Sequence, residues 1–484
     1  MFSEKAPAEV DEHAPSSTRS NMNEIDHQAE DKLVRRIDKF VVPTVMLAYL
    51  LCFLDRTNIG NARLFGLEED LGLEGSQYQI AVAVLFVPYV LIEVPSNLVL
   101  KKLRPSRWLS FITVSWGIVS TCTGFVQNFT GLVAVRVLLG LLEGGLLPGL
   151  TVYLTLFYTK KEIALRIGFL FVSSALAGAC GGLLAYCISF MDGVAGYSGW
   201  RWVFILEGVP TVVFGVVLVF ILADEPRNAW FLSEDEKQLL LARLQRQVGF
   251  HEDFDRKDAI LAAKDWKTWC FAVGQFTVNT MLYSYSVFLP SIIQGLGQWT
   301  SPQAQALTIP CYALGAISYL AVGWISDRQQ LRGLYQVMSL IVCIIGYGIS
   351  LAPVAAAVHY FAMFVISVGL FVAVGLPLAW LPSNNPRYGK RTTASGIQIT
   401  ICNCSGILAP FLYPKTDAPR YVMGYSVSMG LLGLGVFIYS FLLLHFHRIN
   451  KRRKAGKEDY KIEGMTDEEV NALGDRSPRF VYTI

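Results

Sequence analysis

The sequence predicts an all-α membrane protein with twelve transmembrane helices arranged in two six-helix bundles. Three observations lead to this fold class: the composition, the number of apolar segments long enough to span a bilayer, and a polar stretch that divides these segments into two equal sets. The 484 residues are 53% hydrophobic and only 16% charged, and the mean hydropathy of +0.42 is well above that of soluble domains.

The charge and the cysteines exclude several other classes of protein. The net charge is only +3, and the basic residues lie in short loops rather than on one face, so no nucleic-acid partner is expected. The nine cysteines show neither a disulfide framework nor the spacing of metal ligands. No nucleophile–base arrangement indicates an enzyme, and neither a metal nor a cofactor is expected.

The apolar segments have the length that a transmembrane helix needs, about 20 residues. The first six are at about 40–60, 78–100, 108–127, 130–157, 165–190 and 202–223. The second six are at about 266–293, 304–326, 334–353, 358–382, 392–413 and 421–446. The predicted regions are a cytoplasmic N-terminal tail (1–39), an N-terminal six-helix bundle (40–223), a cytoplasmic central loop (224–265), a C-terminal six-helix bundle (266–446) and a cytoplasmic C-terminal tail (447–484).

The distribution of basic residues predicts which loops face the cytoplasm. Basic clusters follow the even-numbered segments, as in "KKLRPSR" (101–107) and "KKEIALR" (160–166), whereas the loops on the other side contain few. By the positive-inside rule, both termini are cytoplasmic. No retrieval signal is evident, so the plasma membrane is the expected location. Within the central loop, "SEDEKQLLLARLQRQ" (233–247) has the capping-box spacing of a helix that lies on the cytoplasmic surface.

Several motifs resemble those of one superfamily of transporters. "GWISDRQQLRG" (323–333) is similar to the loop signature of the major facilitator superfamily, and "RVLLGLLEGG" (136–145) is similar to its fourth-helix signature. Four further motifs are "FLDRTNIGNARL" (53–64), "EVPSNLVLKKLRPSRWL" (93–109), "GWRWVFILEG" (199–208) and "ADEPRNAWFLSEDE" (223–236). Together they resemble the anion:cation symporter family, in its fungal branch of allantoate and nicotinate permeases. The resemblance covers roughly residues 35–450 and implies alternating access around a site between the two halves.

The stretch "YLLCFLDRTNIGNARL" (49–64) places two charges within an apolar span. A charge at the bilayer centre costs about 2.5–3.5 kcal/mol, so it normally faces the bundle interior and has a partner. Asp55 and Asn58 are three residues apart and share a helix face, whereas Arg56 points about 100° away from Asp55. Asp55 and Arg56 are therefore expected to have different partners.

The fourth span carries a second pair of charges, Arg136 and Glu143. Seven residues are two helical turns, so the pair lies on one face with a rise of roughly 10 Å between its members. The two side chains are predicted to bracket a volume rather than to touch. Gly140 and Gly144 permit close helix packing, which keeps this face away from lipid.

These charges suggest how transport is driven. We predict that Asp55 and Glu143 are the proton-coupling pair, and that Arg56 and Arg136 hold the substrate anion or neutralise the empty site, with Asn58 contributing to substrate binding. Burial favours the neutral form of a carboxyl group, and an approaching arginine favours the charged form. The resemblance supports these positions, because matching charged residues are functional in related symporters. The alternative is a structural or gating salt bridge that does not touch the substrate.

Neutral polar residues in the second half complete the predicted substrate site. Asn279 and Tyr283 of the seventh span, and Gln398 and Asn403 of the eleventh, are predicted to orient the substrate by hydrogen bonds. For each of them, helix–helix contact is the alternative.

Further polar residues are assigned other roles. The gating residues Asp327, Arg328 and Arg332 are predicted to belong to the loop that locks the closed state. Glu93 is expected to cap or pair within the second helix, and Glu207 is expected to tie helix ends together. Asn128 opens the glycosylation sequon "NFT" on the predicted outer side, very near the membrane.

The predicted function is proton-coupled uptake of a small organic anion, a carboxylate such as nicotinate, allantoate or a related vitamin or metabolite. The expected partners are this anion, protons and the lipid bilayer, and the protein is expected to be a monomer. The alternative is an exporter of a secondary metabolite or toxin. Such exporters often carry a Gly-Pro motif in the fifth helix, but "SALAGACGGLLAY" (174–186) has the glycines without the proline, which favours uptake.

Overall fold

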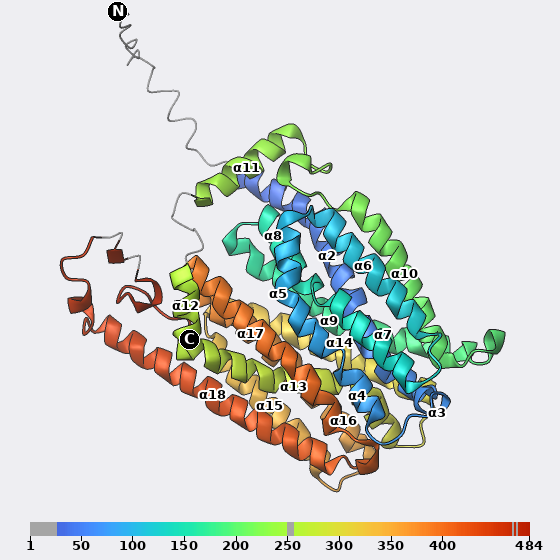
Figure 1. The fold of residues 1–484 in the computed structure, drawn as a ribbon. Coiled ribbons are helices and arrows are strands. Elements are labelled where there is room, and N and C mark those ends of the chain that lie inside the picture. Colours follow the sequence, from blue (N-terminus) through green and yellow to red (C-terminus); the bar gives the residue numbers. More distant parts are fainter. Residues whose placement is uncertain (1–26, 249–255, 467–468, 471–472) are drawn as a thin grey trace, which may run out of the picture.

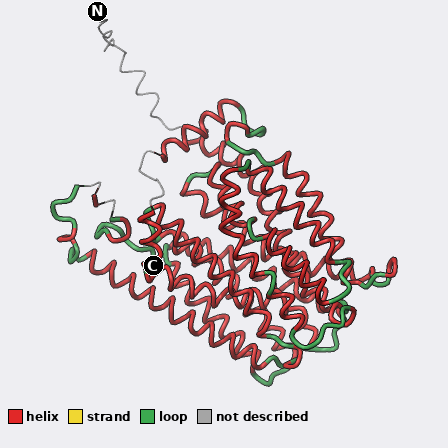
Figure 2. The backbone as a smooth tube through the Cα atoms, viewed as in Figure 1, coloured by secondary structure: helices red, strands yellow, loops and turns green. Residues whose placement is uncertain are grey.

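The computed structural model describes residues 27–248, 256–466, 469–470 and 473–484. This part of the chain is helical and contains no strand (Figure 2). The first half consists of α2 (His27–Leu64), α3 (Leu67–Asp70), α4 (Gln77–Ala83), α5 (Phe86–Lys102), α6 (Pro105–Thr123), α7 (Phe129–Glu143), α8 (Leu146–Phe157), α9 (Lys160–Ile188) and α10 (Gly199–Ile221). The central loop holds α11 (Glu234–Val248) and α12 (Arg256–Lys264). The second half consists of α13 (Trp266–Gly295), α14 (Ser301–Gln329), α15 (Arg332–Leu351), α16 (Ala356–Ser383), α17 (Tyr388–Leu408) and α18 (Val422–Lys454). Short 3-10 turns include η1 (Ser189–Met191), η3 (Pro226–Asn228), η4 (Ala409–Leu412) and η5 (Lys415–Asp417).

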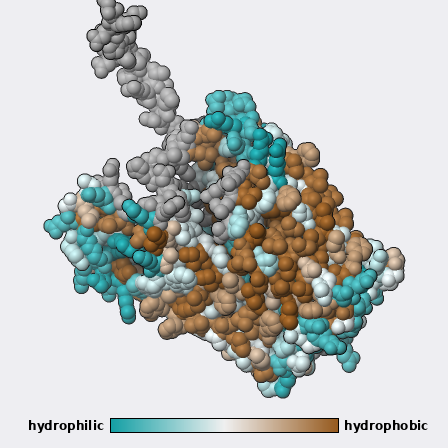
Figure 3. All heavy atoms as spheres, in the orientation of Figure 1, coloured by the Kyte–Doolittle hydropathy of each residue, from teal (hydrophilic) through white to brown (hydrophobic). Residues whose placement is uncertain are grey.

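All twelve predicted segments are helical, and the long helices lie roughly side by side (Figure 1). Nine helices of the described residues are long and apolar enough to cross a membrane. The remaining segments, formed by α4 with α5, by α6 and by α13, pack among them. On the face seen in Figure 3, hydrophobic side chains form a broad band across the middle of the molecule, with hydrophilic side chains gathered toward both ends. We call the end where α2 begins and α18 ends the terminal face, and the end that carries α3 and η5 the opposite face.

Two predicted spans are interrupted, which corrects the expectation of continuous helices. The second segment breaks at Val84 and Leu85, between α4 and α5. Pro88 lacks the amide hydrogen that would bond the Val84 carbonyl, so the regular ladder fails there. The fourth segment breaks at Gly144 and Gly145, between α7 and α8, because a pair of glycines gives the backbone little resistance to kinking.

At both ends of the chain the helices extend beyond the predicted apolar segments. α2 begins at His27 rather than near residue 40, because Leu33 and Ile37 are buried and extend its apolar face. α18 continues to Lys454. In the central loop, the predicted capping box is confirmed at the start of α11, where the Ser233 amide donates to Glu236 Oε2 at 2.8 Å. The sequence did not predict α12.

The two halves close against each other at the opposite face. α2 crosses α13 so tightly that a Cβ atom on Gly60 would lie 2.2 Å from the Val287 carbonyl oxygen, so only glycine fits. Arg63 pairs with Glu68 at 2.8 Å, and Lys415 of the second half pairs with the same Glu68 at 3.0 Å. Among the described residues, the ion pairs that join the halves all lie at this face. The structure is therefore sealed at the opposite face.

A segment that follows the first half fastens it at the terminal face. Arg243 of α11 pairs with Glu162 at the start of α9, and Glu236 of α11 pairs with Arg36 of α2 at 3.1 Å. Arg166 of α9 forms a further ion pair, with Asp38 of α2, at 2.5 Å. α11 thus holds two helices of the first half together, and we call this set of contacts the α11 clasp.

The tail after α18 fastens the second half in a similar way. Asp475 lies between two ammonium groups, 2.6 Å from Lys267 Nζ and 2.8 Å from Lys390 Nζ. The Asn450 side chain pairs with the backbone of Tyr482 through two hydrogen bonds, of 2.8 and 2.9 Å. The tail therefore links α13, α17 and α18, and we call this set of contacts the tail clasp.

The tail clasp is expected to make stability depend on pH. Burial raises the pKa of Asp475, but the ammonium groups of Lys267 and Lys390 outweigh burial and lower that pKa below its usual value. A lowered folded-state pKa contributes stability at neutral pH, and this contribution is lost as the pH falls below about 4, the unfolded value. We expect Asp475→Asn to cost about 2 kcal/mol of unfolding free energy at pH 7 and to flatten the acid limb of the stability profile.

Thermal unfolding in detergent at a series of pH values will test this expectation. Glu463→Gln is the matched control, because Glu463 is an exposed carboxylate of the same tail. Equal stability of Asp475→Asn and the wild type at neutral pH would contradict a stabilising role for the clasp.

Candidate functional site

A polar face on α2 runs through the interior of the first half. Asp55, Arg56 and Asn58 are only 2%, 7% and 0% exposed, although they lie within a helix that is apolar enough to span a membrane. Buried polar groups in such a helix require partners on neighbouring helices. These three side chains find their partners on three different helices, α6, α7 and α10.

Asp55 accepts hydrogen bonds from neutral groups on α6. Trp116 Nε1 donates to Asp55 Oδ2 at 2.5 Å, and the Ser120 hydroxyl donates to Oδ1. No described cation forms an ion pair with this carboxyl group. Arg136 interacts with Asp55 electrostatically but does not touch it. Asp55 is thus a buried carboxyl group held by neutral donors.

Arg56 has a charged partner on α7. Its Nε atom lies 2.5 Å from Glu143 Oε1, and the guanidinium lies 4.6 Å from the ring centroid of Tyr89. The Cys52 thiol also donates to Glu143 Oε1, at 2.9 Å. The prediction that Asp55 and Arg56 need different partners is confirmed.

Arg136 is a buried cation without a carboxylate partner. It is 3% exposed, and its Nε and Nη2 atoms have no hydrogen-bond partner. The ring of Phe204 lies 5.6 Å from its guanidinium. Glu143, two turns further along the same stretch of helix, is engaged by Arg56 instead. The prediction that Arg136 and Glu143 do not touch is therefore confirmed.

The predicted residues of the second half lie on α13 and α17. Asn279 Nδ2 donates to the Cys402 carbonyl at 3.3 Å, and the Tyr283 hydroxyl donates to Asn403 Oδ1 at 3.2 Å. Both contacts join α13 to α17. Gln398 is only 1% exposed, yet neither end of its amide has a partner. Gln398, with both ends of its amide, and Asn403, with its Nδ2 donor, are therefore the members of this set with free hydrogen-bonding capacity.

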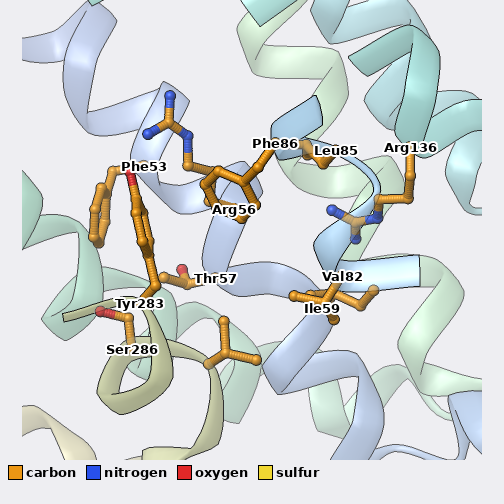
Figure 4. A pocket seen from close by; sticks show the side chains of 11 residues that line it. Phe53, Arg56, Thr57, Ile59, Val82, Leu85, Phe86, Arg136, Tyr283 and Ser286 are labelled. Atoms are coloured by element: carbon orange, nitrogen blue, oxygen red, sulfur yellow. The ribbon is translucent and has the colours of Figure 1, made fainter. Parts of the chain in front are cut away.

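A small cavity separates these polar groups at the junction of the halves. Arg56 and Tyr283 lie close together on one side of it, and Arg136 lies on the other side, beyond Phe86 and Leu85 (Figure 4). The remaining space is about 10 Å³, room for about one water molecule. The rings of Phe86 and Tyr283 are 4.6 Å apart. In this conformation, the aromatic side chains of the two halves close the site.

Glu93 is placed differently from the sequence-based expectation. It was expected to cap or pair within its own helix, but its side chain interacts with Asn403 of α17. One of its carboxylate oxygens has no partner. The reason is the packing of α5 against α17, which directs this face of α5 toward the other half.

The predicted gating residues lie at the terminal face, where α14 meets α15. Arg332 pairs with Asp327 at 2.7 Å and donates to the Ala379 carbonyl of α16, also at 2.7 Å. Arg328 does not join this cluster, and its guanidinium lies 5.5 Å from the ring of Trp324. Asp327 and Arg332 therefore fasten three helices within the second half, and their gating role remains a prediction.

Asn128, the predicted glycosylation acceptor, is exposed and caps the start of α7. Its Oδ1 atom accepts a hydrogen bond of 2.8 Å from the Gly131 amide. This is the position in which asparagine stabilises a helix N-terminus.

Sequence reasoning missed several residues of the site. Trp116 and Ser120 were taken as part of an apolar span, although their spacing of four residues already places them on one helix face. Cys52 lies one turn before Arg56, and its thiol donates to Glu143, the carboxylate that also pairs with Arg56. A search for polar residues at helical spacing around the charged positions would have found Cys52, four residues before Arg56.

The fold and this site together define a class of protein. Twelve packed helices in two halves, sealed at one face and with buried charges at their junction, are the architecture of a secondary transporter. The comparison with known families agrees, because residues 45–410 match the model of the Major Facilitator Superfamily. The chain belongs to this superfamily, and it is a transporter of small molecules rather than an enzyme.

Individual relatives are fungal transporters. The chain is 41% identical over 462 residues to an uncharacterized transporter of Schizosaccharomyces pombe, which covers 94% of this chain and 90% of the relative. It is 32% identical over 458 residues to the high-affinity nicotinic acid transporter of Saccharomyces cerevisiae, covering 94% of this chain and 85% of that protein. These relatives are consistent with the predicted fungal nicotinate permease branch.

A solved structure supports the fold. A bacterial homologue of the human lysosomal transporter Spinster, in an inward-facing and unoccupied conformation, superposes with a TM-score of 0.65 at 16% identity. The superposition covers 84% of this chain and 96% of the other. The predicted fold class is confirmed.

Proposed function

We propose that this protein is a proton-coupled importer of a small organic anion, with a carboxylate as the recognised group. The observation that carries the proposal is Arg136, a buried cation with unpaired hydrogen-bond donors beside the cavity. A buried charge without a partner is costly, so such a group is best explained by a partner that is present for only part of the transport cycle. An arginine fork matches the two oxygens of a carboxylate.

The remaining residues have distinct roles in this proposal. Asp55 carries the proton, because its neutral donors stabilise it without fixing its charge. Glu143 couples protonation to the substrate, since its ion pair with Arg56 must open before Arg56 can reach the anion. Gln398 and Asn58 supply neutral contacts. When the site is empty, ionised Asp55 neutralises Arg136 and allows the carrier to return.

Import of an anion against the membrane potential is favourable only if a proton accompanies it. A negative-inside membrane opposes entry of a monovalent anion by about 2.3 kcal/mol per 100 mV, and one accompanying proton cancels this term. A pH gradient then supplies about 1.4 kcal/mol per unit for each proton.

The nicotinic acid transporter relative favours an aromatic monocarboxylate among possible anions. The lining of the cavity supports the same choice, because Phe53, Phe86 and Tyr283 offer flat apolar surfaces beside the two arginines. We place both termini in the cytoplasm and the protein in the plasma membrane as a monomer. In that orientation the sealed opposite face is extracellular.

Uptake into proteoliposomes will test the function. Purified protein is exposed to an inward proton gradient and a panel of radiolabelled carboxylates, with nicotinate compared with its neutral amide, nicotinamide. We expect a carboxylate to accumulate and its amide not to accumulate, and an uncoupler to abolish the accumulation. If no carboxylate enters but a gradient of the opposite sense expels a metabolite, the protein is an exporter.

A further inference from the structure

Glu207 of α10 is a buried carboxyl group that the transport scheme above leaves unused. It is 6% exposed, and its Oε2 atom accepts a hydrogen bond of 2.6 Å from Asn58 Nδ2. Its other oxygen, Oε1, has no hydrogen-bond partner, and neither does Asn58 Oδ1. Two acceptors are thus left without a donor on two side chains that are already joined.

Among the described residues, no cation pairs with Glu207, and Arg136 instead lies over the ring of Phe204, one turn earlier on α10, at 5.6 Å. α2 brings Asp55 near Glu207, a group of the same charge when ionised, and α9 brings the Cys180 thiol. α6 meets this turn of α10 with Gly117 and Thr121, which are uncharged. The 3-10 turn η1 carries no ionisable side chain. Among the described residues, no lysine, arginine or histidine forms an ion pair with Glu207.

An ionised carboxylate at this position would destabilise the folded protein. Several kcal/mol are needed to bury a charge that has neither a counter-ion nor a full set of donors. A single proton on Glu207 Oε1 removes the charge and supplies a donor that the Asn58 carbonyl can accept. An acid and an amide then satisfy each other through two hydrogen bonds.

We propose that Glu207 is a second proton-carrying residue of the transporter, held as a neutral acid by Asn58 in this conformation and deprotonated when α2 moves away from α10. The step is a simple exchange of one proton between the carboxyl group and water. This inference rests on the proposed proton-coupled function. The inference adds a second proton to the proposed function, because Asp55 and Glu207 together carry two protons for each anion.

Two protons with one monovalent anion carry a net positive charge inward. The wild type is therefore expected to accumulate the anion in response to voltage alone, about tenfold at about 59 mV, inside negative. Glu207→Gln keeps an amide donor toward Asn58 but cannot release a proton. It is expected to transport the anion with one proton, to lose the voltage response, and to retain accumulation driven by a pH gradient.

The experiment combines transport with infrared spectroscopy on the full-length protein. The first measurement is voltage-driven accumulation without a pH gradient, for the wild type, Glu207→Gln, Glu207→Asp and Cys180→Ala. The aspartate variant retains a titratable acid and is expected to recover part of the voltage response, and Cys180→Ala is expected to match the wild type. The second measurement is the carbonyl stretch of a protonated carboxylic acid at neutral pH, which Glu207→Gln should remove.

Each outcome decides the proposal. Loss of both the voltage response and the carbonyl band in Glu207→Gln supports it. A carbonyl band that Glu207→Gln leaves unchanged shows that Glu207 is ionised and overturns the proposal. Loss of the band with an unchanged voltage response shows that Glu207 is protonated but carries no proton during transport, which also overturns the proposal. If the wild type transports no carboxylate, the proposed function fails, and the carbonyl band alone decides whether Glu207 holds a proton.

Discussion

Replacing Arg136 with alanine is expected to abolish transport in every mode, both gradient-driven accumulation and substrate exchange. The guanidinium is buried and has free donors toward the cavity. A charged hydrogen bond contributes about 1.5–3 kcal/mol, so loss of two of them weakens substrate binding by at least about 100-fold. Binding of a radiolabelled substrate in detergent, together with counterflow in proteoliposomes, will measure the loss.

The stability of the same variant provides its control. Arg136 forms no ion pair with a described carboxylate, so Arg136→Ala breaks no salt bridge and should lose less unfolding free energy than a variant that does. Arg56→Ala instead leaves Glu143 without its ion-pair partner, and it should lose about 3–5 kcal/mol of unfolding free energy. If Arg136→Ala unfolds as readily as Arg56→Ala, Arg136 is a structural residue and the substrate role is wrong.

Asp55→Asn is expected to abolish net uptake while leaving exchange intact. Asparagine resembles the protonated acid, so the loaded carrier can still change conformation with substrate bound. The empty carrier cannot return, because no carboxylate is available to neutralise Arg136. Trp116 and Ser120 remain as hydrogen-bonding neighbours of the amide, so the fold is preserved.

Parallel assays of accumulation and counterflow separate these two modes. Ser120→Ala is the matched control, because it removes one donor to Asp55 and leaves the carboxyl group in place. It should shift the pH dependence of uptake without abolishing uptake. Net accumulation by Asp55→Asn at the wild-type level would exclude Asp55 as the coupling residue.

The fold was predictable because a bilayer imposes a simple requirement on sequence. Each span needs about 20 apolar residues, and all twelve were located. The breaks at Val84 and at Gly144 escaped prediction, because interruption of a helix by proline or glycine depends on what packs beside it. α2 closes against α13 at Gly60, and no pattern within a single helix shows such a crossing.

For the site, the sequence predicted only those relations between side chains that follow from the geometry of a single helix. The angle between Asp55 and Arg56 correctly required two different partners, and the two-turn spacing of Arg136 and Glu143 correctly kept them apart. The identity of the partners was not predictable. Trp116 lies on another helix, and which helices become neighbours is decided by the tertiary fold.

The α11 clasp and the tail clasp each lie within one half of the chain, so the chain can be divided into two fragments without breaking either clasp. Each half carries its fastening in the segment that follows it: α11 binds α2 and α9, and the tail binds α13, α17 and α18. A chain cut between α11 and α12 therefore leaves both fragments with a complete set of internal contacts. When the two halves are co-expressed as separate polypeptides, they should insert independently and reassemble into a working carrier. The ion pairs of Lys415 with Glu68 and Glu69 at the opposite face should help the halves to associate.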